Sequence, residues 1–165
     1  MGPEQLSRLV DDYAAALVLY ARQWCAVPED VVQDAFVKLA AQRPPPDNVA
    51  GWLYRVVRNG ALAAVRAERR RRRHESAAAR RTPSWFAASE AARLDAETAT
   101  AALQNLPLEQ REILVAHLWG GLTFEQIGEL IGASSSTAHR RYLAGLSALR
   151  ERLRVPCPND PKTST

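Results

Sequence analysis

The sequence predicts an all-α protein made of two small helical domains joined by a flexible linker, the second with a helix-turn-helix. Alanine is abundant and aromatic residues make up only 7% of the 165 residues, which favours helices. Apolar residues recur at spacings of three and four, whereas the alternating pattern of strands is nearly absent. With 47% hydrophobic and 24% charged residues, the composition is that of an ordinary globular protein.

The first predicted helix spans about residues 4 to 25, and the second begins at Pro28. One continuous apolar stripe defines the first helix. In the second, two acidic residues follow the proline and complement the helix dipole, while Asp34 and Lys38 form a favourable i,i+4 pair. The apolar face of the second helix comprises Val32, Ala35, Phe36 and Leu39.

A third helix is predicted to begin near Val49 and to extend past Arg70, after the proline-rich segment 42–48 ends the second helix. Arginines at spacings of 3, 8, 3 and 4 lie along the face opposite its apolar positions. These arginines are Arg55, Arg58, Arg66, Arg69 and Arg73. Five consecutive arginines at 69–73 point all round a helix, so two or three at most can face one DNA backbone. The others are expected to be solvated or paired with Glu68 or Glu75.

Positive charge is concentrated in this part of the chain. Residues 51–81 contain ten arginines and two glutamates and so carry +8, whereas the whole chain carries +4. Such a local excess favours a nucleic acid or another anionic surface as the partner.

The two cysteines, Cys25 and Cys157, form neither a metal-ligand pattern nor a disulfide framework. We therefore expect Cys25 to lie in the core and the protein to reside in a reducing cytoplasm. The apolar stretch 13–27 is interrupted by Arg22 and predicts neither a signal peptide nor a membrane span.

Residues 76–94 are predicted to form a linker, because small residues and a proline replace any sustained apolar period. Trp85 and Phe86 are unusual in such a segment; they either attach the linker to a neighbouring domain or contact a partner protein. A short helix is expected over about 99–106, and Pro107 opens another that ends at a pair of glycines.

The C-terminal third predicts a helix-turn-helix. Thr123 and Gln126 fit a capping box at the start of the first helix. Gly132 suits the left-handed turn that ends this helix. Either Ser134 or Ser135 then caps the second helix.

The first residues of that second helix would meet base edges in the major groove of duplex DNA. Their hydroxyl and guanidinium groups suit contacts with bases and phosphates. They are Ser135, Ser136, Thr137, His139, Arg140 and Arg141. A helical hairpin with a polar outer face is the alternative interpretation.

The chain resembles the extracytoplasmic-function (ECF) group of bacterial RNA polymerase sigma factors in the sigma-70 superfamily, which have helical domains called regions 2 and 4. The matching segments are "EDVVQDAFVKLA" (29–40), "GWLYRVVRNGALAAVR" (51–66), "LPLEQREILVAHLWGGLTFEQIGELIG" (106–132) and "SSTAHRRYLAGLSALRERL" (135–153). The resemblance implies a region 2 domain over 1–75, a linker over 76–94, a region 4 domain over 95–155 and a disordered tail over 156–165.

The resemblance also implies three binding surfaces and no catalytic, metal or cofactor site. The first would contact the β′ clamp helices of core RNA polymerase through Asp30, Gln33, Asp34 and Phe36. The second would bind the −10 element and the melted strand through Asp47, Asn48, Trp52, Tyr54, Arg55, Arg58, Asn59, Arg66, Arg69 and Arg73. The third, the start of the second helix of the helix-turn-helix, would read the −35 element, and this domain would also contact the polymerase β flap. For Trp52, a core position is the alternative.

On this resemblance the chain is a sigma factor that binds core RNA polymerase and directs promoter recognition and DNA melting for transcription initiation. It would be cytoplasmic, associated with the nucleoid in the holoenzyme, with no membrane partner. A stand-alone helix-turn-helix regulator is the alternative, but it does not explain the basic third helix. An enzyme is disfavoured because the first 95 residues contain no cluster of nucleophile and acid–base groups. We expect control by a separate protein, such as an anti-sigma factor, or by expression.

Overall fold

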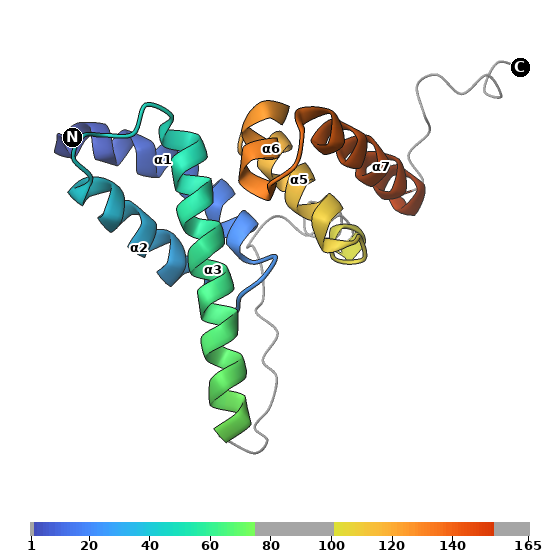
Figure 1. The fold of residues 1–165 in the computed structure, drawn as a ribbon, viewed down its shortest axis with the longest axis horizontal. Helices are drawn as coiled ribbons and strands as arrows, with labels where there is room; N and C mark the ends of the chain where they lie inside the picture. The colour runs from blue at the N-terminus through green and yellow to red at the C-terminus, as the bar shows by residue number, and fades with distance from the viewer. Residues whose placement is uncertain (1, 75–100, 154–165) are drawn as a thin grey trace, which may run out of the picture.

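The computed structural model describes residues 2–74 and 101–153, and the regular elements in these ranges are all α-helices, as predicted (Figure 1). The N-terminal half consists of α1 (Pro3–Ala21), α2 (Pro28–Ala41) and α3 (Val49–His74). The C-terminal half contains α5 (Leu108–Leu118), α6 (Phe124–Ile131) and α7 (Ser135–Leu153). The predicted linker with Trp85 and Phe86 and the predicted tail lie outside the described residues. None of the helices in the described ranges is both long and apolar enough to span a membrane.

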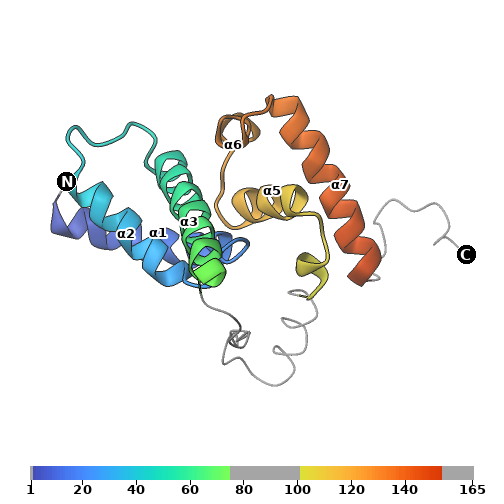
Figure 2. The ribbon, with the colours of Figure 1, turned by 60° about the horizontal axis from the view of Figure 1, so that its bottom comes forward.

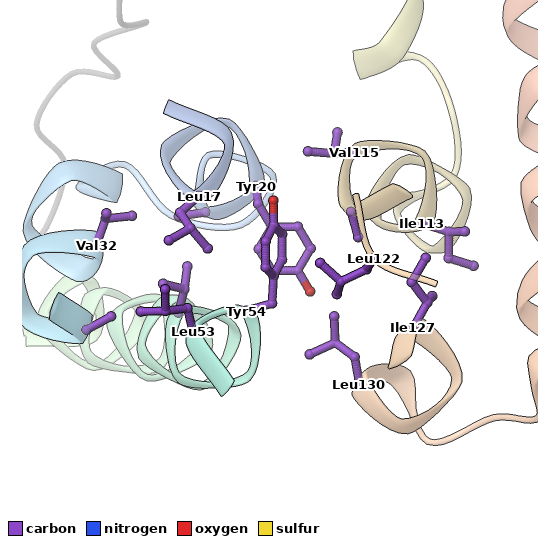
Figure 3. Packing of buried hydrophobic residues seen from close by; sticks show 14 of the residues in the cluster. Leu17, Tyr20, Val32, Leu53, Tyr54, Ile113, Val115, Leu122, Ile127 and Leu130 are labelled. Atoms are coloured by element: carbon purple, nitrogen blue, oxygen red, sulfur yellow. The ribbon is translucent and has the colours of Figure 1, made fainter. Parts of the chain in front are cut away.

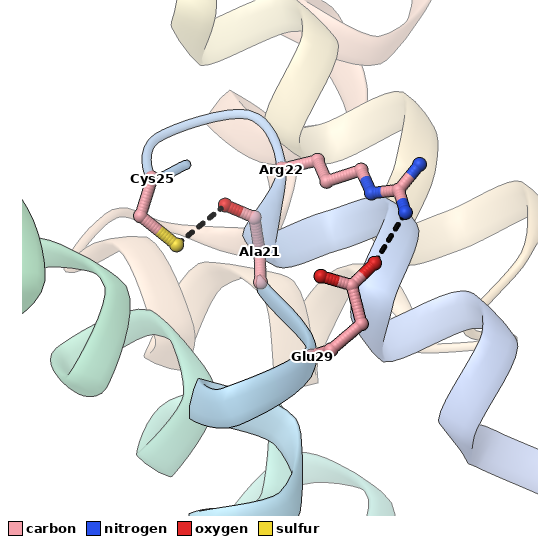
Figure 4. A network of polar contacts seen from close by, with 4 residues as sticks. All are labelled: Ala21, Arg22, Cys25 and Glu29. Carbon is pink, nitrogen blue, oxygen red and sulfur yellow. Dashed lines mark hydrogen bonds and ion pairs between the residues drawn. The ribbon is translucent and has the colours of Figure 1, made fainter. Parts of the chain in front are cut away.

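α1 ends at Ala21, earlier than the predicted end near residue 25, because a turn reverses the chain before α2. Two contacts hold this turn (Figure 4). The Arg22 guanidinium pairs with the Glu29 carboxylate in the first turn of α2, and the Cys25 thiol donates to the Ala21 carbonyl oxygen at 3.5 Å. Cys25 is therefore half-buried in a turn and does not lie in the centre of the core.

α2 forms as the sequence predicts. It begins at Pro28, and Asp34 and Lys38 form the expected pair, with 2.6 Å between carboxylate oxygen and ammonium nitrogen. The four predicted apolar positions are all buried against α1 and α3; they are Val32, Ala35, Phe36 and Leu39.

α3 starts where Asn48 caps it, because the Asn48 side-chain oxygen accepts a hydrogen bond from the Gly51 amide at 2.9 Å. Its first half is packed into the core, whereas its second half extends beyond the other helices (Figure 1). In that second half, Arg71 and Arg72 pair with Glu68 at 3.1 and 2.7 Å. Part of the arginine run is thus neutralised by its own helix, as expected.

The helix-turn-helix is confirmed at α6 and α7. Both hydrogen bonds of the Thr123–Gln126 capping box are present, and Gly132 has a φ of 70° in the left-handed region. Ser134 is the residue that caps α7, since its Oγ accepts from the Thr137 amide at 3.2 Å. Ala138 is fully buried on the inner face of α7.

The two halves pack against each other side by side and share one hydrophobic core (Figures 1 and 2). α1 contacts α5, and α3 contacts α6. Tyr20 and Tyr54 lie at the centre of this junction, facing Leu122 and Leu130 of the other half (Figure 3). A second, smaller cluster around Leu114 lies within the C-terminal half. The C-terminal half thus has some core of its own and also contributes to a core that spans the junction.

Candidate nucleic-acid interface

The start of α7 gathers the six residues predicted to read duplex DNA. Ser136, His139 and Arg140 are exposed, whereas the other three are half-buried. The ring of His139 lies against that of Phe124, with 4.8 Å between centroids. Their proximity follows directly from the sequence, because all six lie within two turns of one helix.

Hydroxyl groups at this end of α7 are already engaged with one another. Ser134 Oγ lies 2.9 Å from Thr137 Oγ1 and 3.2 Å from Ser136 Oγ. The hydroxyls of Ser136 and Thr137 are thus partly engaged within the start of α7 itself.

The two arginines of α7 are in different environments. Arg141 pairs with Glu109 of α5 at 3.1 Å, whereas Arg140 is exposed and has no ion pair with any described residue. An exposed guanidinium at the start of a recognition helix can bind guanine through two hydrogen bonds. Arg140 is thus the better placed of the two to read a base.

The loop before α3 and the first turns of α3 form a second candidate surface. Asp47 and Asn48 are exposed, but the Asn48 side-chain oxygen is used in capping α3. Trp52 is half-buried and packs against the core, so its ring is only partly accessible. Arg55 and Asn59 are exposed on the same helix.

Tyr54 lies in a different place from that expected of a strand-contacting residue. It is fully buried at the junction, and its ring centroid is 4.8 Å from that of Tyr20. Burial raises the pKa of its phenol. Its hydroxyl is buried without a hydrogen-bond partner among the described residues. In this arrangement the C-terminal half covers Tyr54.

Arg58 likewise points into the junction. Its Nε donates to Oε1 of Glu112 at 2.7 Å, and the same oxygen accepts from the Tyr20 hydroxyl at 2.6 Å. Burial opposes the charge on Arg58, but the Glu112 carboxylate outweighs it and raises the pKa of the guanidinium. Burial, reinforced by the same carboxylate, raises the pKa of Tyr20 well above its ordinary value. Tyr20 is therefore a neutral hydrogen-bond donor.

The outer half of α3 presents its arginines to solvent. Arg66, Arg69 and Arg73 are exposed, and none of them forms an ion pair with a described residue. Their charges are therefore available to phosphates, which is the role that the sequence predicts for them.

The residues expected to bind polymerase separate into two environments. Asp30, Gln33 and Asp34 are exposed along one edge of α2, although Asp34 is paired with Lys38. Phe36 is 8% exposed and packs in the core, as its place in the apolar stripe requires. The exposed acidic edge is thus the part of this helix that is open to a partner.

Sequence reasoning missed the buried contact between Glu112 and Tyr20. They are 92 positions apart, and each is inconspicuous in its own segment. Glu112 lies among apolar neighbours on α5, and its side chain is 5% exposed. It is the only charged residue that is buried in the described part of the chain. A glutamate directly before the apolar run 113–116 was the available signal, because a buried carboxylate requires a partner.

Two family models match this chain. The model for sigma-70 region 2 matches residues 9–71, and the model for sigma-70 region 4 matches residues 96–149. The first covers all of α2 and most of α1 and α3, and the second covers all of α5 and α6 and most of α7.

Curated relatives resemble most of the chain. RNA polymerase sigma factor CarQ of Myxococcus xanthus is 30% identical over 131 residues, which span 78% of this chain and 75% of CarQ. The ECF RNA polymerase sigma factor SigE of Mycolicibacterium smegmatis is 31% identical over 132 residues, spanning 76% of this chain and 51% of SigE.

Solved structures share the fold. The sigma factor RpoE of Bartonella quintana, in complex with the anti-sigma factor NepR, superposes with a TM-score of 0.75 at 21% identity, covering 94% of this chain and all of RpoE. CnrH, in complex with the cytosolic domain of CnrY, gives a TM-score of 0.63 at 23% identity, covering 94% of this chain and 92% of CnrH.

Proposed function

The chain belongs to the ECF group of sigma-70 RNA polymerase sigma factors and so serves transcription initiation; from this premise we propose which of its two halves binds each partner. The N-terminal half binds core RNA polymerase and the melted −10 strand, and the C-terminal half reads the −35 element. The observation that carries the proposal is the succession of region 2 and region 4 in one chain. The domain bounds that follow are 1–75 and 95–155, with a linker at 76–94 and a tail at 156–165.

For the −35 element, the proposal assigns base reading to the start of α7. Arg140 is exposed and without an ion pair in the described part of the chain, which supports a direct guanine contact. Arg141, held by Glu109, is better suited to a phosphate. The remaining residues of this surface are Ser135, Ser136, Thr137 and His139.

For the −10 element, the proposal places the flipped base against the loop at Asp47 and Asn48. Extruding a base costs a few kcal/mol. Stacking on an aromatic ring contributes about 1–3 kcal/mol per base and offsets that cost. Trp52, at the start of α3, is the half-exposed ring beside this loop. The melted strand then follows Tyr54, Arg55, Arg58 and Asn59, and duplex phosphates lie along Arg66, Arg69 and Arg73.

Core polymerase is bound through two surfaces in this proposal. The acidic edge of α2, with Asp30, Gln33 and Asp34, contacts the β′ clamp helices, and Phe36 supports that edge from within the core. Leu118 and Trp119 are large apolar residues, 48% and 49% exposed, at the end of α5. They are suited to an apolar contact with the β flap.

The chain is proposed to have no catalytic activity of its own and to act in the cytoplasm, associated with the nucleoid in the holoenzyme. An anti-sigma factor is proposed as a further partner. This is supported by RpoE of Bartonella quintana, which shares the fold and whose solved structure is a complex with the anti-sigma factor NepR.

Run-off transcription with core polymerase over a genomic library tests the proposal. Specific transcripts that depend on the added chain are expected, and their start sites identify the promoter. The alternative of a stand-alone regulator predicts the opposite result: tight binding to duplex DNA by the chain alone and no effect on core polymerase.

A further inference from the structure

The ring of Phe124, the first residue of α6, contacts both α5 and the start of α7. Phe124 is half-buried and stacks on His117 of α5, with 4.5 Å between ring centroids and 24° between ring planes. Its centroid also lies 5.4 Å from that of Tyr142 and 4.8 Å from that of His139, both on α7. His139 is exposed, whereas the other two neighbours are half-buried. One aromatic ring thus connects the interior of this half with the surface proposed to read the −35 element.

The Phe124 ring is held in place by its surroundings. The capping box of Thr123 and Gln126 orders the first turn of α6, with hydrogen bonds of 2.8 and 3.3 Å. The Leu122 carbonyl oxygen can only accept, so His117 Nδ1 is the donor in the 2.8 Å contact between them. The imidazole that stacks on Phe124 is therefore itself fixed. Phe124 is in turn a fixed support for whatever rests on it.

His139 differs from the other exposed residues of this surface. Its imidazole lies against Phe124. Arg140, by contrast, has no ion pair with a described residue, and the Ser136 hydroxyl lies 3.2 Å from that of Ser134. Neither ring nitrogen of His139 forms a hydrogen bond with a described residue. A neutral imidazole has one N–H donor and one acceptor nitrogen, so His139 is supported from behind while its polar atoms are available to a base.

Support of this kind affects both affinity and selectivity. A flexible side chain must be ordered when it binds, and a side chain that is already held in its bound orientation avoids most of that entropy cost. A hydrogen bond also depends on the distance and the angle between donor and acceptor. A fixed ring behind His139 therefore favours a hydrogen bond with one particular base edge over a contact that any sequence could make.

We propose that Phe124 is a positioning residue for promoter recognition, which holds the His139 imidazole so that its N–H donates to an acceptor on one base pair of the −35 element. Purine N7, guanine O6 and thymine O4 are the acceptors that the major groove presents. The proposal rests on the proposed function of α7, which assigns His139 to this surface. His139 contacts the base, and Phe124 acts through His139.

The test uses the full chain bound to core polymerase and promoters in which each base pair of the −35 element is replaced in turn. The ratio of run-off transcript from the parent promoter to that from each substituted promoter measures discrimination, and it does not depend on the folded fraction of a variant. His139→Ala is expected to lose about three- to tenfold of discrimination at one base pair, the size of one hydrogen bond. Phe124→Leu is expected to lose most of it at the same base pair. Phe124→Tyr, which keeps the ring, is expected to retain it.

Ile131→Ala is the matched control. Ile131 lies two turns further along α6 and is also a half-buried apolar residue that packs against the core. Its truncation is expected to lower the total transcript and to leave the preference at every base pair unchanged. In the His139→Ala background, Phe124→Leu is expected to add no further loss at the affected base pair, because the two residues act as one unit.

Two results of this comparison would overturn the proposal. One is a Phe124→Leu variant that keeps the discrimination lost in His139→Ala. The other is a His139→Ala variant with unchanged preference at every base pair.

The support also has a spectroscopic signature in the free chain. The ring current of Phe124 shifts the NMR signals of nearby protons, so the carbon-bound imidazole protons of His139 are expected to change chemical shift in Phe124→Leu. They are expected to stay close to their wild-type positions in Ile131→Ala. The signals are assigned by their loss in His139→Ala. Equal His139 shifts in wild type and Phe124→Leu would show that the ring does not hold the imidazole.

The outcomes also separate this proposal from the proposed function. If the wild-type chain directs transcription while Phe124→Leu matches it at every base pair, the positioning role alone fails. The wild-type chain could instead yield no transcript and select one duplex by itself. If His139→Ala and Phe124→Leu then lose the same base pair on that duplex, the proposed function fails and the positioning of His139 stands.

Discussion

The phenolic oxygen of Tyr54 packs directly against Gly120 of the opposite half. A β carbon at Gly120 would come within 2.3 Å of the Tyr54 oxygen and 2.5 Å of the Ala116 carbonyl oxygen. The absence of a side chain at Gly120 is therefore what allows α3 and the end of α5 to approach so closely.

Gly120→Ala is accordingly expected to lower the free energy of unfolding by about 1–3 kcal/mol, as overpacking of a tight contact does. Urea unfolding followed by circular dichroism measures the change. Gly2→Ala is the control, because nothing lies within 4 Å of a β carbon there. Indistinguishable urea midpoints for the two variants would show that the contact at Gly120 is not tight.

The two junction tyrosines are expected to differ in how substitution by phenylalanine changes the free energy of unfolding. Tyr20→Phe removes a donor to a buried carboxylate and should cost about 1.5–3 kcal/mol, the range for hydrogen bonds to charged groups. Tyr54→Phe removes a buried hydroxyl that has no partner among the described residues and should be neutral or stabilising by about 1 kcal/mol. Thermal and urea unfolding of both variants measure this difference, and a loss of equal size in both would contradict the hydrogen-bond assignment.

Stability should fall steeply in alkaline solution because of Tyr20. Burial, with the Glu112 carboxylate, raises its pKa in the folded protein above the ordinary 10.0 of the unfolded chain. Below that ordinary pKa, Tyr20 is protonated in both the folded and the unfolded chain, so its contribution to the free energy of unfolding is fully present. As pH rises above it, Tyr20 ionises first in the unfolded chain, and this contribution is lost. Wild type is expected to lose more stability than Tyr20→Phe between neutral pH and pH values above about 10; parallel pH profiles would contradict the raised pKa.

Arg140→Ala is expected to weaken binding to the specific −35 duplex by about 1–3 kcal/mol and to leave binding to scrambled duplexes nearly unchanged. The measurement is a competition assay with both duplexes at fixed salt, using the full chain in complex with core polymerase. If affinity fell equally on every sequence, Arg140 would be a phosphate contact. Arg141→Ala, which removes a guanidinium already paired with Glu109, is the natural comparison.

Local sequence patterns were sufficient to predict most of the fold. α2 begins at Pro28 and the capping box forms at Thr123, because each depends on residues within one or two turns. The end of α1 was misplaced because the apolar stripe continues through Trp24, whereas the turn is fixed by contacts with α2. Periodicity describes which face is buried better than it describes where a helix ends.

The candidate site was predictable only where its residues are close in sequence. The surface of α7 proposed to read the −35 element is one such case, and its six residues do lie together. By contrast, the contact of Glu112 with Tyr20 and Arg58 depends on how two halves pack, which no spacing within either half encodes. The burial of Tyr54 has the same origin, since its neighbours Leu122 and Leu130 belong to the other half.

The length of α3 has a geometric consequence for the DNA it would hold. Its 26 residues extend about 39 Å at 1.5 Å per residue, close to the roughly 34–36 Å of one turn of B-DNA. The helix is thus a rigid spacer between the loop proposed to bind a base at one end and the arginines proposed to bind phosphates at the other. Inserting a single residue in its middle would rotate those arginines by about 100° around the axis. If the proposed contacts form, the register between opened and duplex DNA is set by the number of residues in α3 as much as by their charge.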